Sequence, residues 1–422
     1  MKNIILLSLL IIAQITQAQT YTVVAENLRL PTGIRFDSQN RLWVVESGYG
    51  FNDGAVSILD SNGTPLPVVV GLPSVFDTIS QENVGPWHTC DLGNGKFGLT
   101  EGVTGQVLNF DVSGFTPGVS IPLTVSDTLG TLEVAAYAIA HNFIESDPYT
   151  MALDAAGNVY VADAAANAII KSDVNGQMST FATFPVITNP LPFGPPFSDA
   201  VPTRIVAKPG GGFYVCQLTG FPFLDGAASV FHVDTNGNVS TYATGLTLLT
   251  DMLLDENTGD LYVVQFGRFD LNIFDFELNS AKVIRIKANG EQEVVAGNLN
   301  LAPGLAMDAE GSLYVSELAS GRILKLETST DSREPALAVS AFSIFPNPAT
   351  DFVKIKYTLE SKSSVQINIL DVHGKIAYTE SINQQEKGQH EINCQLTSLP
   401  AGPYWVDIQT NRGTITRQLL IH

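Results

Sequence analysis

Short apolar runs separated by turn residues recur between residues 21 and 327. Six segments share one order: a turn, an apolar strand that closes on a polar residue, a tight turn, and a second apolar strand. They are Pro31–Glu46, Pro86–Glu101, Pro148–Asp163, Pro202–Gln217, Leu249–Gln265 and Pro303–Glu317. Repeats of roughly 50 residues that each hold several short strands are typical of β-propellers. The pattern therefore predicts an all-β fold whose first body is a six-bladed β-propeller.

The turns between the runs carry the residues that tight β-hairpins need. Asn-Gly pairs stand at residues 62–63, 175–176, 236–237 and 289–290. Asn and Gly readily adopt the positive φ angles of a short hairpin turn. The same strings resemble calcium-binding loops, but no acid stands where such a loop has its bidentate ligand. The hairpin is the preferred interpretation.

One strand is missing from the sixth repeat. After Arg322–Leu326 the chain becomes polar and then Ala-rich, whereas an unassigned strand, Tyr21–Ala25, stands at the other end of the first body. We predict that Tyr21–Ala25 completes the sixth blade, because a closed ring leaves no exposed sheet edge.

Long insertions fall in two kinds of connection, if the four strands of a blade are named A to D in chain order. B-to-C connections are extended at 47–54, 218–227 and 266–280, and D-to-A connections at 121–147 and 186–200. Both kinds emerge on one face of a propeller. Binding residues often lie on such loops, so we predict the binding site on this loop-rich face. Within 121–147, apolar periodicity predicts a helix over Leu132–Asn142.

The C-terminal body, residues 342–422, alternates apolar and polar residues with a period of two, as in Val353–Tyr357 and Tyr404–Ile408. About seven short strands of this kind predict a small immunoglobulin-like β-sandwich. Residues 329–341 are predicted to be a linker, so the propeller is expected to span residues 19–328.

The N-terminus is predicted to be a secretory signal. Lys2 precedes an apolar run, and small residues at Thr16 and Ala18 mark a cleavage site after residue 18. The run is too short to anchor the chain, and no later stretch suggests a transmembrane segment. The formal net charge is −20, from 22 Lys and Arg against 42 Asp and Glu. This charge argues against nucleic acid and favours a neutral or cationic partner, or an anion only through a bridging metal.

Several residues of the first body are candidates for a site. Four acids, Glu46, Glu101, Asp163 and Glu317, end equivalent B strands. Carboxylates that share one face of a propeller can hold a divalent cation such as calcium. The alternative is that each acid bonds turn amides of its own blade.

Three further polar residues stand in the A strands. Arg204 and Asp251 lie at the same height in neighbouring repeats, which predicts either an ion pair between blades or a substrate clamp. His88 replaces an apolar residue of its column, as a satisfied core histidine or as a base or ligand at the mouth.

Aromatic residues gather in the insertions. Phe221, Phe223, Phe266 and Phe269 are the candidates for an apolar binding patch, although some loop aromatics must pack the loops onto the scaffold.

The first body resembles the ScyD/ScyE family of propellers, which are similar to NHL-repeat propellers. The strings that carry the resemblance are Asp147–Tyr149, Val159–Ala164, Ala200–Thr203, Leu218–Phe223 and Gly226–Ala228. The resemblance covers about residues 21–327. It implies a propeller and a secreted protein, and it carries no established catalytic residues.

The C-terminal body resembles the type A sorting domain of the type IX secretion system. Phe345–Ala349, Leu399–Tyr404 and Arg417–Ile421 carry this resemblance. It implies handling by the type IX machinery, removal of the domain, and release or attachment at the cell surface. An ordinary adhesive sandwich is the alternative.

Two classes of function follow. The first is a secreted or surface-attached propeller that binds a small molecule or a protein at its loop-rich face. The alternative is a metal-dependent hydrolase or lyase with its site at the channel mouth, by analogy with other propellers. The sequence holds no nucleophile elbow and no His-Glu-x-x-His motif, which favours binding.

Overall fold

The computed structural model describes residues 21–78, 82–326, 339–359, 362–370, 376–397, 399–410 and 413–422. The chain divides into two compact units, residues 1–328 and 329–422. The predicted signal peptide lies outside the described residues. Most of the predicted linker does as well, and strand β31 (Val339–Phe345) already begins inside it.

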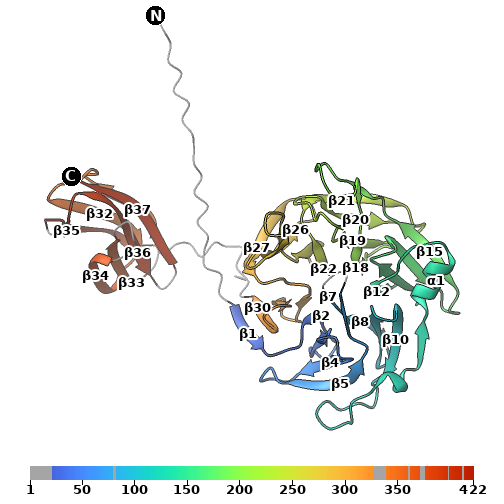
Figure 1. Ribbon diagram of the computed structural model, residues 1–422. Helices are drawn as coiled ribbons and strands as arrows, with labels where there is room; N and C mark the ends of the chain where they lie inside the picture. Colours follow the sequence, from blue (N-terminus) through green and yellow to red (C-terminus); the bar gives the residue numbers. More distant parts are fainter. Residues whose placement is uncertain are drawn as a thin grey trace, which may run out of the picture. The chain divides into compact units, whose positions relative to one another are not determined.

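The first unit contains six antiparallel sheets of four strands (Figure 1). Sheet 1 consists of β2 (Pro31–Phe36), β3 (Leu42–Glu46), β4 (Gly54–Leu59) and β5 (Pro65–Leu72); sheet 2 of β8 (Pro86–Gly93), β9 (Lys96–Glu101), β10 (Gln106–Asp111) and β11 (Gly130–Leu132); sheet 3 of β12 (Pro148–Leu153), β13 (Val159–Asp163), β14 (Ala168–Ser172) and β15 (Met178–Thr183). Sheet 4 consists of β18 (Pro202–Ala207), β19 (Phe213–Gln217), β20 (Ala228–Val233) and β21 (Val239–Leu246); sheet 5 of β22 (Leu249–Asp255), β23 (Asp260–Gln265), β26 (Ala281–Ile286) and β27 (Gln292–Leu299); sheet 6 of β28 (Leu305–Met307), β29 (Leu313–Glu317), β30 (Arg322–Leu326) and β1 (Tyr21–Ala25).

The sheets surround a common centre in a propeller-like arrangement. The first strand in each of sheets 1 to 5 contacts the first strand of the next sheet, and β28 of sheet 6 contacts β2 of sheet 1. Strand β1 pairs antiparallel with β30, with Tyr21 opposite Leu326 and Thr22 opposite Lys325. The predicted completion of the sixth sheet by Tyr21–Ala25 is therefore confirmed.

Apolar side chains between neighbouring sheets form the core of this unit. Tyr160 of sheet 3 packs with Phe213 and Ile205 of sheet 4, and Cys216 of sheet 4 packs with Met252 of sheet 5. Strands such as β3 are buried along their whole length, which explains why the B strands read as continuous apolar runs. Each fully buried large side chain contributes about 1.5–3 kcal/mol.

The hairpin interpretation of the Asn-Gly turns is confirmed. Asp173 Oδ1 accepts the amides of Asn175 and Gln177 at 2.9 and 2.8 Å, and Gly176 has a φ of 82°. Asp234 bonds Asn236 and Asn238 in the same way. These carboxylates cap their own turns, as Asx turns do.

One predicted insertion is divided differently. Strand β11 lies inside residues 121–147, so the short 3-10 turn Val125–Asp127 belongs to the C-to-D connection of sheet 2. That connection emerges on the face opposite the loop-rich one, so the prediction that the whole of 121–147 is a D-to-A connection on the loop-rich face is wrong. Three residues of strand are too few to show a period in the sequence. The predicted helix is present as α1 (Val134–Ala140).

Three two-stranded hairpins stand in the connections of the loop-rich face. They are β6–β7 (Val75–Asp77 and Glu82–Val84), β16–β17 (Ile187–Thr188 and Phe197–Ser198) and β24–β25 (Arg268–Asp270 and Asp275–Glu277). Each hairpin satisfies backbone groups that a long irregular loop would leave unpaired.

The second unit consists of two antiparallel sheets around one apolar core. The first sheet has β31, β32 (Phe352–Leu359) and β35 (Gly388–Gln395), and the second has β34 (Ile376–Gln385), β33 (Ser363–Leu370), β36 (Gly402–Thr410) and β37 (Gly413–Ile421). Val353 and Ile355 of the first sheet share this core with Ile367 and Val406 of the second. The immunoglobulin-like connectivity stays a prediction. No helix among the described residues is long and apolar enough to cross a membrane.

Candidate functional site

His88, Arg204 and Asp251 meet at the centre of the first unit. His88 belongs to sheet 2, Arg204 to sheet 4 and Asp251 to sheet 5. His88 Nε2 lies 3.1 Å from Asp251 Oδ2, and Arg204 Nε lies 3.2 Å from Asp251 Oδ1. An Arg204 terminal nitrogen lies 3.2 Å from His88 Nδ1. The expected ion pair is present, and His88 joins it from across the ring. We call this group the axial triad.

The axial triad satisfies its own polar atoms. Asp251 also accepts the backbone amides of Met252 and Leu305, both at 2.8 Å. These partners imply that His88 Nε2 carries the ring proton and that Nδ1 accepts from Arg204. A Cβ added to Gly33 would lie 2.6 Å from the His88 ring, so a glycine is required in sheet 1 beside it.

The charges of the triad follow from burial and pairing. Burial lowers the pKa of His88, and the Arg204 charge lowers it further against the pull of Asp251. Burial alone would raise the pKa of Asp251, but Arg204 and the hydrogen bonds outweigh it and the pKa is lowered. A neutral imidazole thus sits beside a paired carboxylate and guanidinium. This arrangement joins three sheets. Both ring nitrogens of His88 are engaged in it, so neither is free to accept a proton from a substrate.

A second group, which the sequence did not single out, lies beside the triad. Trp87 Nε1 donates to Asp147 Oδ1 at 2.8 Å, and the rings of Trp87 and Tyr149 lie 5.5 Å apart. Burial raises the pKa of Asp147 to about 7, and Asp163 and other acids add to the shift. In sheets 1, 4 and 5 a threonine follows the first residue of the A strand, whereas sheets 2 and 3 have Trp87 and Tyr149 at this position. This difference between the repeats is the sequence signal that could have indicated the group.

The four acids that end B strands are not brought together. Each accepts hydrogen bonds from its own neighbourhood: Glu46 from Arg29 N at 2.7 Å, Glu101 from Val103 N at 2.7 Å, Asp163 from Asp147 N at 2.7 Å, and Glu317 from Asn300 N at 2.8 Å. Among the described residues there is no group of three or more His, Cys, Asp or Glu side chains that could hold a metal ion. Nearby amides satisfy these carboxylates, so the geometry gives no support to the shared calcium site.

The four candidate phenylalanines form one cluster. Phe223 and Phe269 have ring centroids 5.1 Å apart, Phe221 and Phe223 6.0 Å, and Phe266 reaches the group through Phe276 at 5.2 Å. Phe274 also contacts Phe221. These six residues, which we call the phenylalanine cluster, come from the B-to-C connections of sheets 4 and 5.

Apolar side chains next to the cluster remain exposed. Ile273, Phe274 and Leu278 are 65%, 62% and 62% exposed in and beside hairpin β24–β25. Phe193 and Phe197 are 42% and 55% exposed on the connection that precedes sheet 4. A Cβ on Gly194 would lie 3.1 Å from the Phe221 ring, so this connection packs against the cluster. The cluster thus supports an apolar surface that water still covers.

Comparison with known families identifies the second unit. Residues 343–422 match the family described as the secretion system C-terminal sorting domain. A domain of this kind indicates a secreted or cell-surface protein. No curated protein matches the chain in sequence.

Solved structures similar to this chain have low identity to it. A Bacteroides thetaiotaomicron protein of unknown function has a TM-score of 0.49 at 12% identity, over 73% of this chain and 75% of its own. A streptogramin B lyase has a TM-score of 0.43 at 14% identity, over 73% and 96%. PorZ, a surface component of the type IX secretion system of Porphyromonas gingivalis, has 0.42 at 14%, over 94% of this chain and 59% of PorZ. At these scores the similarities do not bear on activity.

Proposed function

We propose that this chain is a type IX export substrate whose first unit is a six-bladed β-propeller of the ScyD/ScyE kind that acts as a binding module outside the cell. The phenylalanine cluster and the exposed side chains on it carry the proposal. Two long connections from different sheets fold together into that cluster. Binding of a partner that covers such an exposed apolar surface is favourable, because it removes apolar area from water.

The same surface suggests the chemistry of the partner. Residues 19–338 hold 14 Lys and Arg against 35 Asp and Glu. Asp270 and Asp275 flank the exposed tip of hairpin β24–β25. An apolar surface with an acidic rim favours a partner with apolar anchors and basic or neutral flanks.

The catalytic alternative receives no specific support. His88, Arg204 and Asp251 bond one another and the backbone, and each candidate metal-binding carboxylate already accepts hydrogen bonds from amides of its own surroundings. Binding is therefore the function that we propose.

Site-specific photocross-linking at Phe274 tests the binding proposal. A photoreactive phenylalanine analogue at position 274 of the exported protein should capture a partner on intact cells. The same analogue at Val174, which is 66% exposed in the opposite-face turn of sheet 3, is the matched control. Equal capture at both positions, or none at 274, would contradict the proposal.

Mass spectrometry of the exported protein tests the sorting role separately. We expect the extracellular form to end before the sorting domain. Extracellular protein that still ends at His422 would show that the domain is retained, as an adhesive sandwich would be.

A further inference from the structure

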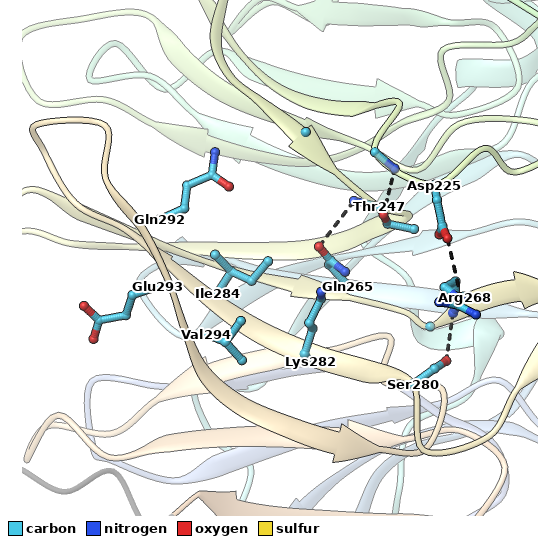
Figure 2. A pocket seen from close by; sticks show the side chains of 13 residues that line it. Asp225, Thr247, Gln265, Arg268, Ser280, Lys282, Ile284, Gln292, Glu293 and Val294 are labelled. Carbon is cyan, nitrogen blue, oxygen red and sulfur yellow. Dashed lines mark hydrogen bonds and ion pairs between the residues drawn. The ribbon is translucent and has the colours of Figure 1, made fainter. Parts of the chain in front are cut away.

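A groove of about 440 Å³ lies between sheets 4 and 5, beside the phenylalanine cluster. Figure 2 shows it, with Asp225 and Arg268 at one end, Gln292 and Glu293 at the other, and Lys282 between them. A volume of this size is within the usual range of small-molecule sites. We call it the Lys282 groove.

Two hydrogen-bond donors in this groove have no acceptor among the described residues. Gln265 is 4% exposed; its Oε1 accepts the Thr247 amide at 3.3 Å, and its side-chain nitrogen donates to no described residue. Lys282 likewise forms no hydrogen bond or ion pair with a described residue. It acts on Asp225 only through its charge, which opposes the rise in the pKa of Asp225 that burial causes. Gln265 Nε2 is not among the buried side-chain atoms that lack a hydrogen-bond partner, so it keeps contact with water in the groove. Both donors are therefore available to a ligand there.

Strand register brings these two donors together. Gln265 on β23 lies directly opposite Lys282 on β26. Side chains at opposed positions share one face of the sheet with Cβ atoms roughly 5 Å apart. In Figure 2 the Lys282 ammonium lies next to the Gln265 carboxamide. One acceptor group placed between them would satisfy both.

The equivalent position in sheet 6 shows what is missing. There Glu317 lies directly opposite Arg322, and the two form an ion pair of 2.6 Å. Sheet 5 has a cation at the same place on its third strand but a glutamine in place of the acid. The absent carboxylate is therefore the group that a ligand would supply.

The remainder of the lining indicates the body of that ligand. Ile284 and Val294, an opposed pair on β26 and β27, give a short apolar floor. Asp225 and Glu293 offer acceptor oxygens in addition to their ion pairs with Arg268 at 3.6 Å and Lys287 at 3.0 Å. Gln292 offers its amide oxygen, while its nitrogen donates to Thr244 O at 3.0 Å. Acceptors that surround a site for a carboxylate suit hydroxyl groups as donors.

We propose that the Lys282 groove binds a small carboxylic acid that carries several hydroxyl groups, such as a sugar acid. Its carboxylate lies between Gln265 and Lys282, and its hydroxyl groups donate to the acidic and amide ends of the groove. Residues 19–338, with 14 Lys and Arg against 35 Asp and Glu, carry a net charge of −21 that opposes an anion, so the attraction is local and comes from the Lys282 ammonium. This site is separate from the apolar surface of the proposed binding module and does not depend on it.

Calorimetric titration of the mature protein with D-glucuronate tests the inference. D-glucose, which lacks the carboxylate, and hexanoate, which lacks the hydroxyl groups, are the comparison ligands. We expect saturable binding of glucuronate and affinities at least about tenfold lower for both comparison ligands, as expected from the loss of charge-assisted or multiple hydrogen bonds.

Variants locate the site. Lys282→Met and Gln265→Glu should each weaken glucuronate binding at least about tenfold, the second because the introduced carboxylate would pair with Lys282 as in sheet 6. Gln217→Glu, at the same strand position in sheet 4, and Phe274→Ser should bind as the wild type does. Unfolding curves confirm that each variant is folded, and Lys282→Gln replaces Lys282→Met if that variant is not.

Three results would overturn the inference. The first is no saturable glucuronate binding by the wild type up to about 10 mM. The second is equal binding by the Lys282 and Gln265 variants, and the third is binding of glucose or hexanoate as tight as that of glucuronate. Cross-linking at Phe274 with no glucuronate binding would leave the binding module intact and remove this site alone.

Discussion

Sheets 5 and 6 place similar residue pairs at the same position, yet only the pair in sheet 6 forms an ion pair. We call a pair closed when its two side chains bond each other and open when they do not. In sheet 6, Glu317 bonds Arg322 and the Asn300 amide. In sheet 5, Gln265 faces Lys282 and leaves both donors open. The two positions differ in the acid, which Gln265 replaces, and in the cation, which is Lys282 instead of Arg322. Loss of the carboxylate is the change that leaves the cation of sheet 5 without an ion-pair partner.

The axial triad extends the comparison to the centre of the unit. His88, Arg204 and Asp251 are closed upon one another, as Glu317 and Arg322 are. Charged residues at the axis thus hold sheets together, whereas Gln265 and Lys282 in the Lys282 groove keep hydrogen-bonding capacity for a ligand. Breaking closed pairs should lower stability, and closing the open pair should lower binding instead.

The largest effect is expected at the axial triad. Asp251→Ala removes the partner of the partly exposed Arg204 and of the buried His88, and it leaves two buried backbone amides without their acceptor. It should lower the free energy of unfolding by about 3–5 kcal/mol. Urea unfolding of the mature protein measures this. Asp251→Asn, which keeps the shape and removes the charge, is the control for cavity formation. A loss below about 1 kcal/mol in Asp251→Ala would show that the triad does not join the sheets.

A smaller effect is expected when the closed pair of sheet 6 is opened. Glu317 Oε2 accepts hydrogen bonds from Arg322 and Ser320. Glu317→Gln can put an NH2 group at this place, which cannot accept them, and it removes the negative charge. Because Arg322 is 35% exposed, we expect a loss of only about 1–2 kcal/mol in the same urea assay. If stability does not change, then sheets 5 and 6 do not differ in the way that the comparison requires.

The sequence predicted those features that depend on local pattern or on neighbouring repeats. Strand order and the completion of sheet 6 follow from apolar periodicity, and the possible ion pair of Arg204 with Asp251 follows from the adjacency of their repeats. The contact of His88 with Asp251 crosses the ring, and no sequence spacing signals it. The four acids occupy equivalent positions, but local amides satisfy each of them separately. The Lys282 groove depends on the register across a long insertion, which the sequence does not reveal.

The smallest effect on stability, and the sharpest test of the comparison, is expected from closing the open pair of sheet 5. Gln265→Glu should raise the free energy of unfolding by at most about 0.5 kcal/mol, because Lys282 gains a partner near the surface while the Thr247 amide keeps its acceptor. The gain should vanish when Lys282→Met is also present, and a double-mutant cycle of urea midpoints measures that coupling. A loss of more than about 1 kcal/mol in Gln265→Glu would mean that Lys282 does not reach position 265 as Arg322 reaches Glu317. The carboxylate position inferred for the groove would then lie elsewhere.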